Sequence, residues 1–328
     1  MTQTQTDYLA AHAAQIAEAA QTIRPHIRRT PILRPPQHDQ LTLKPECFQV
    51  TGSFKTRGAF NAVFRLKATH PDTKGVIAVS SGNHAQALAL AAQTAGLPAL
   101  ILIPEDANPA KIAATRGYGA TVKTEGITFA NREEQLQQAA QETGFTIVHP
   151  FDNWDIIHGA GTAAREVLED DPETQTIVAP TGGGGLLSGT ALSAKHHNPQ
   201  IRVIGVEPER ADDAARTLKT GQIQRLPDSP DTIADGVRTV SIGHKNFEVI
   251  VEQGLVDDIV TVSEEQIAEA TRYAWLDLKL ALEPTGALPL AAYLSNKRSH
   301  SNGQAQTALI LSGGNANPNL ISRLLSNP

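Results

Sequence analysis

Cysteine is almost absent from this chain: Cys47 is the only one among 328 residues, which excludes an internal disulfide framework and a cysteine-rich metal site. Basic blocks are also absent and the formal net charge is −6, so nothing favours nucleic acid or an anionic membrane surface as a partner. No apolar run approaches membrane-spanning length, and residues 1–7 are polar and lack the apolar core of a signal peptide. These absences predict a globular protein of the cytoplasm.

Short apolar segments with strand character alternate with helical segments along the whole chain. A chain of this length can bury a large core and usually forms two domains or one large one. The alternation predicts an α/β fold in which helices cover parallel sheets. The strand-like segments are residues 41–44, 75–79, 99–103, 146–148, 176–179, 201–206 and 308–311.

One lysine follows a Gly-Ser turn and precedes a run of small residues with helical character. Residues 51–59 read Thr-Gly-Ser-Phe-Lys-Thr-Arg-Gly-Ala, and the lysine is Lys55. An amine held at a helix start can serve covalent chemistry, although a lysine in such a place is more often a solvated surface charge. Lys55 therefore needs support from other parts of the sequence.

Three strand-like segments are each followed by a polar or glycine-rich turn. These turns are residues 80–86 (Ser-Ser-Gly-Asn-His-Ala-Gln), 181–189 (Thr-Gly-Gly-Gly-Gly-Leu-Leu-Ser-Gly) and 312–315 (Ser-Gly-Gly-Asn). Each alone could be a simple turn or a helix cap. Open α/β sheets, however, bind ligands at the carboxyl ends of their strands. The four glycines followed by a helix favour a phosphate, because free backbone amides converge there.

Taken together, these motifs resemble those of the fold-type II pyridoxal-phosphate enzymes, in the group of serine/threonine dehydratases and serine racemases. The resemblance runs from residues 29–32 to residues 312–315. It implies a two-domain α/β fold in which each domain is an open, mostly parallel sheet flanked by helices. Residues 1–68 and 150–328 would form a large, discontinuous cofactor-binding domain, and residues 69–149 a small mobile one. It also implies pyridoxal 5′-phosphate as the cofactor and a homodimer.

The resemblance assigns cofactor-binding roles position by position. Lys55 matches the lysine that holds the cofactor as a Schiff base, and Phe54 matches the aromatic residue that packs on the cofactor ring. Asn83 matches the residue that hydrogen-bonds the phenolic oxygen, and Ser312 the residue that faces the pyridine nitrogen. The remaining matches are two positions that line the ring, Gly236 and Glu283, and the phosphate-binding amides of Gly182, Gly183, Gly184, Gly185 and Leu186.

A hydroxyl at Ser312 favours elimination over transamination. Unlike a carboxylate, it does not favour a protonated pyridine nitrogen, so the ring is a weaker electron sink and a β-leaving group departs readily. We expect Lys55 to take the α-proton of a hydroxy amino acid, with L-threonine and L-serine as the leading substrates, giving a 2-oxo acid and ammonia. The residues expected to hold this substrate lie at a helix start: Ser80, Ser81, Asn83 and His84.

Other activities stay open. Ser81 matches the serine that faces the substrate opposite the lysine in the racemases of the family, which permits racemisation of serine or aspartate. Arg132 falls near the arginine that reaches a dicarboxylate, which points to threo-3-hydroxyaspartate ammonia-lyase activity, but an ordinary surface arginine beside Glu133 and Glu134 is an equally good interpretation. An interpretation from another class is a non-catalytic phosphate-binding protein in which Lys55 is only a cation.

One acidic segment resembles the divalent-cation site of the family. Residues 207–213 read Glu-Pro-Glu-Arg-Ala-Asp-Asp and follow the strand-like segment 201–206. On this match the ligands are the carboxylates of Glu207 and Asp213 and the backbone carbonyl of Ala211, and the ion is Mg²⁺, Ca²⁺ or Mn²⁺. The alternative is an acidic turn that caps a helix beginning near Ala214.

Two features depart from the usual pattern of the family. Pro45 is expected to interrupt the strand-like segment 41–44 just before the lysine motif. Residues 159–162 read Gly-Ala-Gly-Thr where many relatives have Gly-Gln-Gly-Thr, which predicts a differently shaped substrate pocket.

Overall fold

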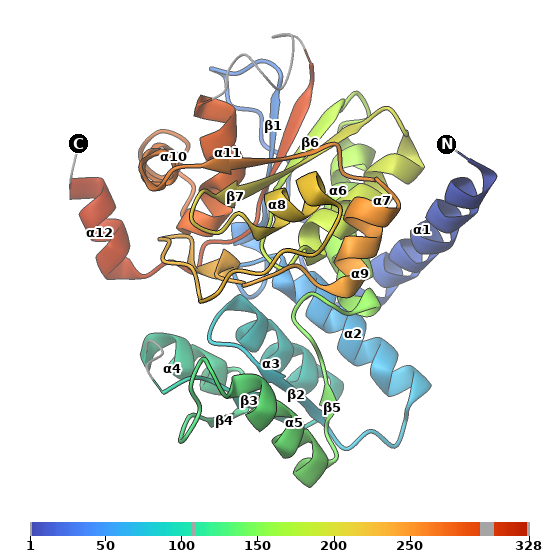
Figure 1. Ribbon diagram of the computed structural model, residues 1–328, viewed down its shortest axis with the longest axis vertical. Helices are drawn as coiled ribbons and strands as arrows, with labels where there is room; N and C mark the ends of the chain where they lie inside the picture. Colours follow the sequence, from blue (N-terminus) through green and yellow to red (C-terminus); the bar gives the residue numbers. More distant parts are fainter. Residues whose placement is uncertain (1, 106–108, 296–304, 327–328) are drawn as a thin grey trace.

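Two parallel β-sheets, each flanked by helices, form the computed structural model, which describes residues 2–105, 109–295 and 305–326. In Figure 1 the larger sheet and its helices occupy the upper part of the molecule and the smaller sheet with its helices the lower part. No helix within these ranges is long and apolar enough to cross a membrane.

The larger sheet has the strand order β1-β9-β6-β7-β8, and every neighbouring pair in it is parallel. Pro45 ends β1 and is paired in register with Leu311, so the expected interruption of this strand by proline is wrong. A proline is tolerated there because β1 lies at the edge of the sheet. The strands are β1 (Leu41–Pro45), β9 (Thr307–Leu311), β6 (Thr176–Pro180), β7 (Arg202–Pro208) and β8 (Asp258–Val262).

Both faces of the larger sheet are buried, because successive side chains of its strands enter different hydrophobic clusters. On β6, Ile177 and Ala179 pack with the residues of α6 and α7, whereas Val178 packs with those of α10 and α11. This near-continuous apolar character is typical of a parallel sheet with helices on both sides. The helices are α6 (Trp154–Asp170), α7 (Gly185–His197), α10 (Glu264–Leu276) and α11 (Pro284–Ser295).

The smaller sheet has the order β4-β3-β2-β5 and is also parallel throughout. Its core includes alanines of α3 packed against Val76 and Ile101. Alanine allows close packing of helix on sheet at little cost in side-chain entropy. The strands are β2 (Val76–Val79), β3 (Ala99–Leu102), β4 (Thr121–Lys123) and β5 (Thr146–Ile147); the helices are α3 (Asn83–Ala95), α4 (Pro109–Gly117) and α5 (Arg132–Thr143).

Helix α2 (Lys55–Thr69) packs against both α3 and α6. It approaches α6 so closely that a Cβ on Gly159 would lie 2.5 Å from the carbonyl oxygen of Arg57. Residues 159–162 therefore serve helix packing and do not line the cavity described below, so the expectation that they shape the pocket is wrong. The other elements are α1 (Gln3–Ile23), α8 (Asp213–Thr220), α9 (His244–Phe247), α12 (Pro318–Ser326) and the short helices η1 (Glu46–Phe48), η2 (Asp235–Val237) and η3 (Glu248–Glu252).

The α/β class and the parallel sheets expected from the sequence are confirmed. Strands β4 and β8 were not expected: both are edge strands, and β4 has only three residues with two of them exposed. The smaller sheet is built from residues 76–147. The proposed division into domains at residues 68 and 149 stays a prediction.

Candidate active site

Two motifs far apart in the chain, around Lys55 and around Ser312, are hydrogen-bonded to each other. The amide of Gly314 donates to the carbonyl oxygen of Gly52 at 2.9 Å, and the amide of Phe54 donates to the carbonyl oxygen of Ser312 at 3.0 Å. These bonds join the turn before α2 to the carboxyl end of β9. Lys55, the first residue of α2, is thereby fixed beside Ser312.

The Lys55 side chain is half-buried, and its amine has no acidic partner among the described residues. Its Nζ donates to the carbonyl oxygen of Pro150 at 2.8 Å and lies 5.1 Å from the centre of the Phe54 ring. Burial without a counter-charge lowers the pKa of Lys55 to about 8. About a tenth of the amine is therefore neutral at pH 7, far more than for a solvated lysine, and a nucleophile or a base must be neutral.

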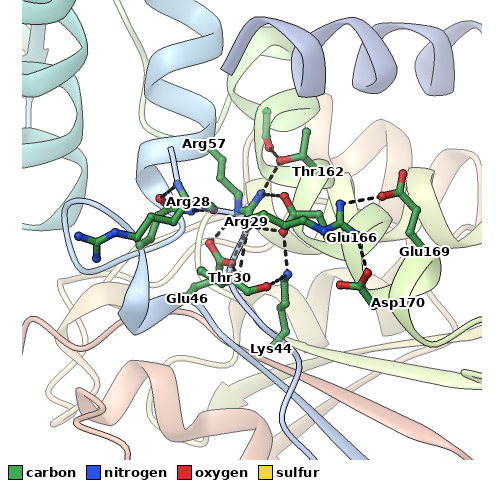
Figure 2. A network of polar contacts seen from close by, with 12 residues as sticks. Arg28, Arg29, Thr30, Lys44, Glu46, Arg57, Thr162, Glu166, Glu169 and Asp170 are labelled. Atoms are coloured by element: carbon green, nitrogen blue, oxygen red, sulfur yellow. Dashed lines mark hydrogen bonds and ion pairs between the residues drawn. The ribbon is translucent and has the colours of Figure 1, made fainter. Parts of the chain in front are cut away.

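A buried network of ion pairs anchors α2 two residues beyond Lys55 (Figure 2). Arg57 Nε donates to Glu46 Oε2 at 2.7 Å, and Arg57 Nη2 donates to Glu166 Oε2 at 2.8 Å. Lys44 Nζ donates to the same Glu166 oxygen at 2.7 Å. Two cations are thus matched by two carboxylates. Burial opposes the charged form of Glu46, yet Arg57 holds the pKa of this carboxyl below its ordinary value.

A cavity of about 780 Å³ opens beside Lys55, between elements of the two sheets. Its wall combines residues from all the polar turns except the glycine segment. The residues expected from the sequence that line it are Phe54, Lys55, Ser80, Ser81, Asn83, His84, Arg132, Gly236, Glu283 and Ser312.

Asn83, at the start of α3, connects the two sides of the cavity. Its Nδ2 donates to Glu283 Oε1 at 2.7 Å, and its Oδ1 accepts from Asn315 Nδ2 at 2.8 Å. Burial, followed by the charge of Asp235, raises the pKa of Glu283 to about 7. Asp235 itself is paired with Lys111 of α4. Three polar contacts therefore hold the smaller sheet's helices against the larger sheet's loops.

Two neutral histidines stand near Lys55. His84 Nε2 donates to the carbonyl oxygen of Val148 at 3.0 Å, and burial, then the charge of Lys55, lower the pKa of His84 to about 3. His149 Nδ1 accepts from the amide of Asp152 at 2.9 Å, and burial lowers its pKa to about 4. Neither ring is an acid at neutral pH, so the geometry favours a positioning role for His84 over general-acid catalysis.

The glycine segment lies behind Phe151, which lines the cavity, and is not itself part of the wall. A Cβ on Gly183 would lie 2.3 Å from the Phe151 ring, and Gly184 has φ +96°, so both positions need glycine. Helix α7 begins at Gly185. The amides of Gly185 and Leu186 have no partner within the helix because they belong to its first turn, which leaves them free for an anion.

Glu207, near the end of β7, and Asp213, the first residue of α8, form a buried acidic pair. Glu207 accepts from the amides of Ala214 and Ala215 at 3.2 and 2.8 Å, and neither Asp213 carboxylate oxygen has a partner among the described residues. Burial, then the charge of Asp213, raise the pKa of Glu207, and burial raises the pKa of Asp213 to about 7. No group of three or more histidine, cysteine or acidic side chains that could hold a metal occurs in the described part of the chain.

Arg132 lines the cavity and is half-buried there. Its side chain is 26% exposed, its guanidinium lies 3.6 Å from the centre of the Phe129 ring, and Nε lies 3.7 Å from Glu133 Oε1. Sequence reasoning missed several other wall residues. These missed residues are His149, Phe151, Asp152, Lys111, Phe129, Arg225 and Arg238. The first three could have been found, because they follow strand β5 as the recognised polar turns follow β2, β6 and β9.

Known proteins resemble the chain over almost its full length. A family model described as pyridoxal-phosphate dependent enzyme matches residues 23–313. A serine racemase of Oryza sativa subsp. indica is 42% identical over 314 residues, covering 93% of this chain and 91% of that protein. An L-threo-3-hydroxyaspartate ammonia-lyase of Saccharomyces cerevisiae is 39% identical, covering 95% of each. The crystal structure of a threonine deaminase from T.th. has a TM-score of 0.86 at 46% identity, covering 93% of this chain and 98% of that one.

Proposed function

Because the chain belongs to the family of pyridoxal-phosphate dependent enzymes, we propose that it catalyses β-elimination from a hydroxy amino acid, with L-threonine and L-serine as the leading substrates. The resemblance drawn from the sequence motifs is confirmed at this level: the relatives are ammonia-lyases and racemases with fold-type II structures. The products would be a 2-oxo acid and ammonia. The identity of the substrate and the roles of individual residues are proposals.

The residues present fit pyridoxal 5′-phosphate. Lys55 has a partly neutral amine and no acidic partner among the described residues. The glycine segment has backbone amides that a phosphate can approach, and its close packing leaves no room for a Cβ. Asn83 and Ser312 lie on the same cavity wall, where they would contact the ring. When bound, the cofactor supplies an electron sink beside the α-carbon of the substrate.

The chain's own groups would move one proton and hold the substrate still. The α-proton passes to the Lys55 amine, whose lowered pKa keeps it able to accept the proton. The bond between the β-carbon and the hydroxyl oxygen breaks with its electron pair going to the oxygen, which takes up one proton and leaves as water, balancing the proton removed from the α-carbon. Hydrolysis of the released enamine then gives the 2-oxo acid and ammonia. The start of α3, with Ser80, Ser81 and His84 beside it, suits the α-carboxylate of the substrate.

The Lys55 amine, half-buried on the cavity wall without an acidic partner among the described residues, is the observation that carries this proposal. The test is a product assay of the cofactor-loaded protein with L-threonine, L-serine and D-serine, in which 2-oxo acids and amino-acid enantiomers are quantified together. We expect oxo acid from the L-substrates and a loss of about 10²–10⁴-fold or more in Lys55→Ala. A colourless protein that binds phosphate and makes no oxo acid would instead support the non-catalytic alternative.

Two observations favour further activities of the same site. Ser81 lies on the cavity wall with Lys55, which supports serine or aspartate racemisation as a second candidate; the rice relative is named a serine racemase. Arg132 lies on this wall as well, which supports threo-3-hydroxyaspartate as a substrate; the yeast relative is named for that substrate. Dominant D-serine formation in the product assay would put the racemase first.

We also propose a divalent cation at Glu207, Asp213 and the carbonyl of Ala211. Two buried carboxylates with raised pKa values and unpaired Asp213 oxygens suit a hard cation completed by water, such as Mg²⁺, Ca²⁺ or Mn²⁺. A homodimer, a cytoplasmic location and a mobile small domain of residues 69–149 are proposals of the same standing. Sedimentation of the purified protein would test the dimer.

A further inference from the structure

The loop between β5 and α6, residues 148–153, contacts both the Lys55 amine and the glycine segment. Lys55 Nζ donates to the carbonyl oxygen of Pro150 at 2.8 Å. The ring of the next residue, Phe151, packs so closely on the glycine segment that a Cβ on Gly183 would lie 2.3 Å from it. The position of this loop therefore affects both the amine and the backbone amides that are proposed to bind phosphate.

The short helix α9 is bonded to this loop and to the glycine segment. The Asp152 carboxylate accepts from the amides of His244 and Lys245, at 3.1 and 2.9 Å. The amide of Gly243, the residue before α9, donates to the carbonyl oxygen of Gly183 at 3.1 Å. Backbone amides at the start of α9 therefore tie the loop and the glycine segment to one element.

One side chain of α9 joins the same two segments. Asn246 is fully buried, and its Nδ2 donates to the carbonyl oxygen of Phe151 at 3.2 Å. Its Cβ packs against Gly184, where an added Cβ would lie 2.7 Å from it. Asn246 therefore contacts both the glycine segment and the backbone of Phe151, whose ring covers that segment.

Packing alone does not explain an asparagine at this position. The Oδ1 of Asn246 is buried and has no hydrogen-bond donor among the described residues. Reversing the amide would bring Oδ1 against the Phe151 carbonyl oxygen, and two acceptors repel each other, so Nδ2 keeps the bond. A leucine, which has the same branched shape, would fill the space without leaving a buried polar atom of its own unpaired. The bond to Phe151 is what the asparagine adds.

We propose that Asn246 is a positioning residue: through the carbonyl of Phe151 it holds the Phe151 ring against the glycine segment and so orders the amides that bind the cofactor phosphate. The inference rests on the proposed function and deepens it. Asn246 acts through Phe151 and Gly184, because it is not itself one of the described residues that line the cavity.

Equilibrium binding to the full-length protein, measured by absorbance, tests this without turnover. The two probes, pyridoxal 5′-phosphate and pyridoxal, differ only in the phosphate, and the wild type should bind the first more tightly. Asn246→Leu keeps the branched shape and removes the donor, so we expect the ratio of the two dissociation constants, Kd for pyridoxal over Kd for pyridoxal 5′-phosphate, to fall about 3- to 10-fold, the size of a lost hydrogen bond. Asn319→Leu, at an exposed position of α12, is the matched control and should keep the wild-type ratio.

An unchanged ratio in Asn246→Leu would overturn the positioning role, because an asparagine that only fills space affects stability and not the preference for the phosphate. Equal binding of the two probes by the wild type would overturn it as well. Urea denaturation shows whether the variant is folded; if leucine prevents folding, Asn246→Ala, which is too small to clash, should lower the ratio to the same degree. If the ratio depends on Asn246 but no hydroxy amino acid gives a 2-oxo acid, the proposed function fails and the positioning role stands.

Discussion

The network around Arg57 and the pair formed by Glu207 and Asp213 are both buried clusters of charge, but only the first contains its own counter-charges. In the network, Arg57 and Lys44 donate to Glu46 and Glu166 at 2.7–2.8 Å, and the pKa of Glu46 is lowered. In the acidic pair, burial raises both pKa values instead; the charge of Asp213 adds to the effect at Glu207, and the charge of Asp212 adds to it at Asp213.

The difference shows how burial acts on a charge with and without a partner. A buried charge keeps its ionised form where the chain supplies an opposite charge within hydrogen-bond distance. Where the chain supplies none, the group shifts toward its neutral form or requires a ligand. The network is therefore part of the scaffold under Lys55, whereas the acidic pair fits a cation. Lys55 follows the same rule as the acidic pair but with the opposite sign. Burial, the one cause of its shift, lowers the pKa of this amine and so also favours the neutral form.

Breaking the balanced network should have the largest effect. Arg57→Met leaves Glu46 buried without its cation, so we expect the free energy of unfolding to fall by about 3–5 kcal/mol, measured by urea denaturation. Arg116→Met on the exposed face of α4 should change it by less than about 0.5 kcal/mol. A loss below about 1 kcal/mol in Arg57→Met would contradict the view that its charges are tightly coupled.

Supplying the missing charge to the acidic pair should have the next largest effect. At a concentration of Ca²⁺ or Mg²⁺ about 100 times its dissociation constant, the free energy of unfolding should rise by about 2.7 kcal/mol, and a chelator should reverse this. Asp213→Asn should remove the response, whereas Asp72→Asn, an exposed residue, should keep it. An unchanged melting temperature with either ion, or a response that persists in Asp213→Asn, would count against the cation site.

The dependence of the free energy of unfolding on pH, below neutral pH, tests whether Glu46 is stabilised as a charge. Because its folded pKa lies below the unfolded value, this carboxylate contributes stability that is fully present above the unfolded value of 4.5 and is lost as the pH falls through the folded pKa. We expect Glu46→Gln to be less stable at neutral pH and to lose less stability than the wild type on acidification. Parallel stability curves from pH 6 to pH 3 for the two proteins would contradict this assignment.

The smallest predicted effect concerns the Lys55 amine, which has no acidic partner among the described residues. With a Lys55 pKa of about 8, the neutral fraction rises about tenfold between pH 7 and pH 9, so the initial rate of pyridoxal 5′-phosphate incorporation into cofactor-free protein should rise by about this factor and level off. Absorbance in the near ultraviolet and visible range follows the incorporation. A rate still rising steeply above pH 10 would show that Lys55 behaves as a solvated lysine.

The sequence was sufficient to predict the elements that carry strong local signals. Apolar segments bounded by polar turns identified most strands. Open α/β sheets bind ligands at the carboxyl ends of their strands, and Asn83 after β2 and Ser312 after β9 both line the cavity with Lys55. The short edge strand β4 carried too weak a pattern to be found. Pro45 was misjudged because local reasoning does not reveal that β1 is an edge strand.

Long-range pairing explains what could not be predicted. Arg57 and Glu166 are 109 residues apart, and nothing local distinguishes this buried ion pair from two surface charges. Phe129 and Arg225 lie outside the strand-end turns, so only the folded chain brings them to the cavity wall. Phe151, which covers the glycine segment, likewise depends on the packing of one loop against another.

The central claim is that Lys55 is the amine that performs the chemistry. Borohydride reduction of the cofactor-loaded protein, followed by proteolysis and mass spectrometry, tests it directly, because reduction fixes the cofactor to the lysine that holds it. We predict that the added mass lies on the peptide containing Lys55 and not on Lys44, whose amine is paired with Glu166. Modification of a different lysine, or of none in a protein that still releases 2-oxo acid, would contradict the account.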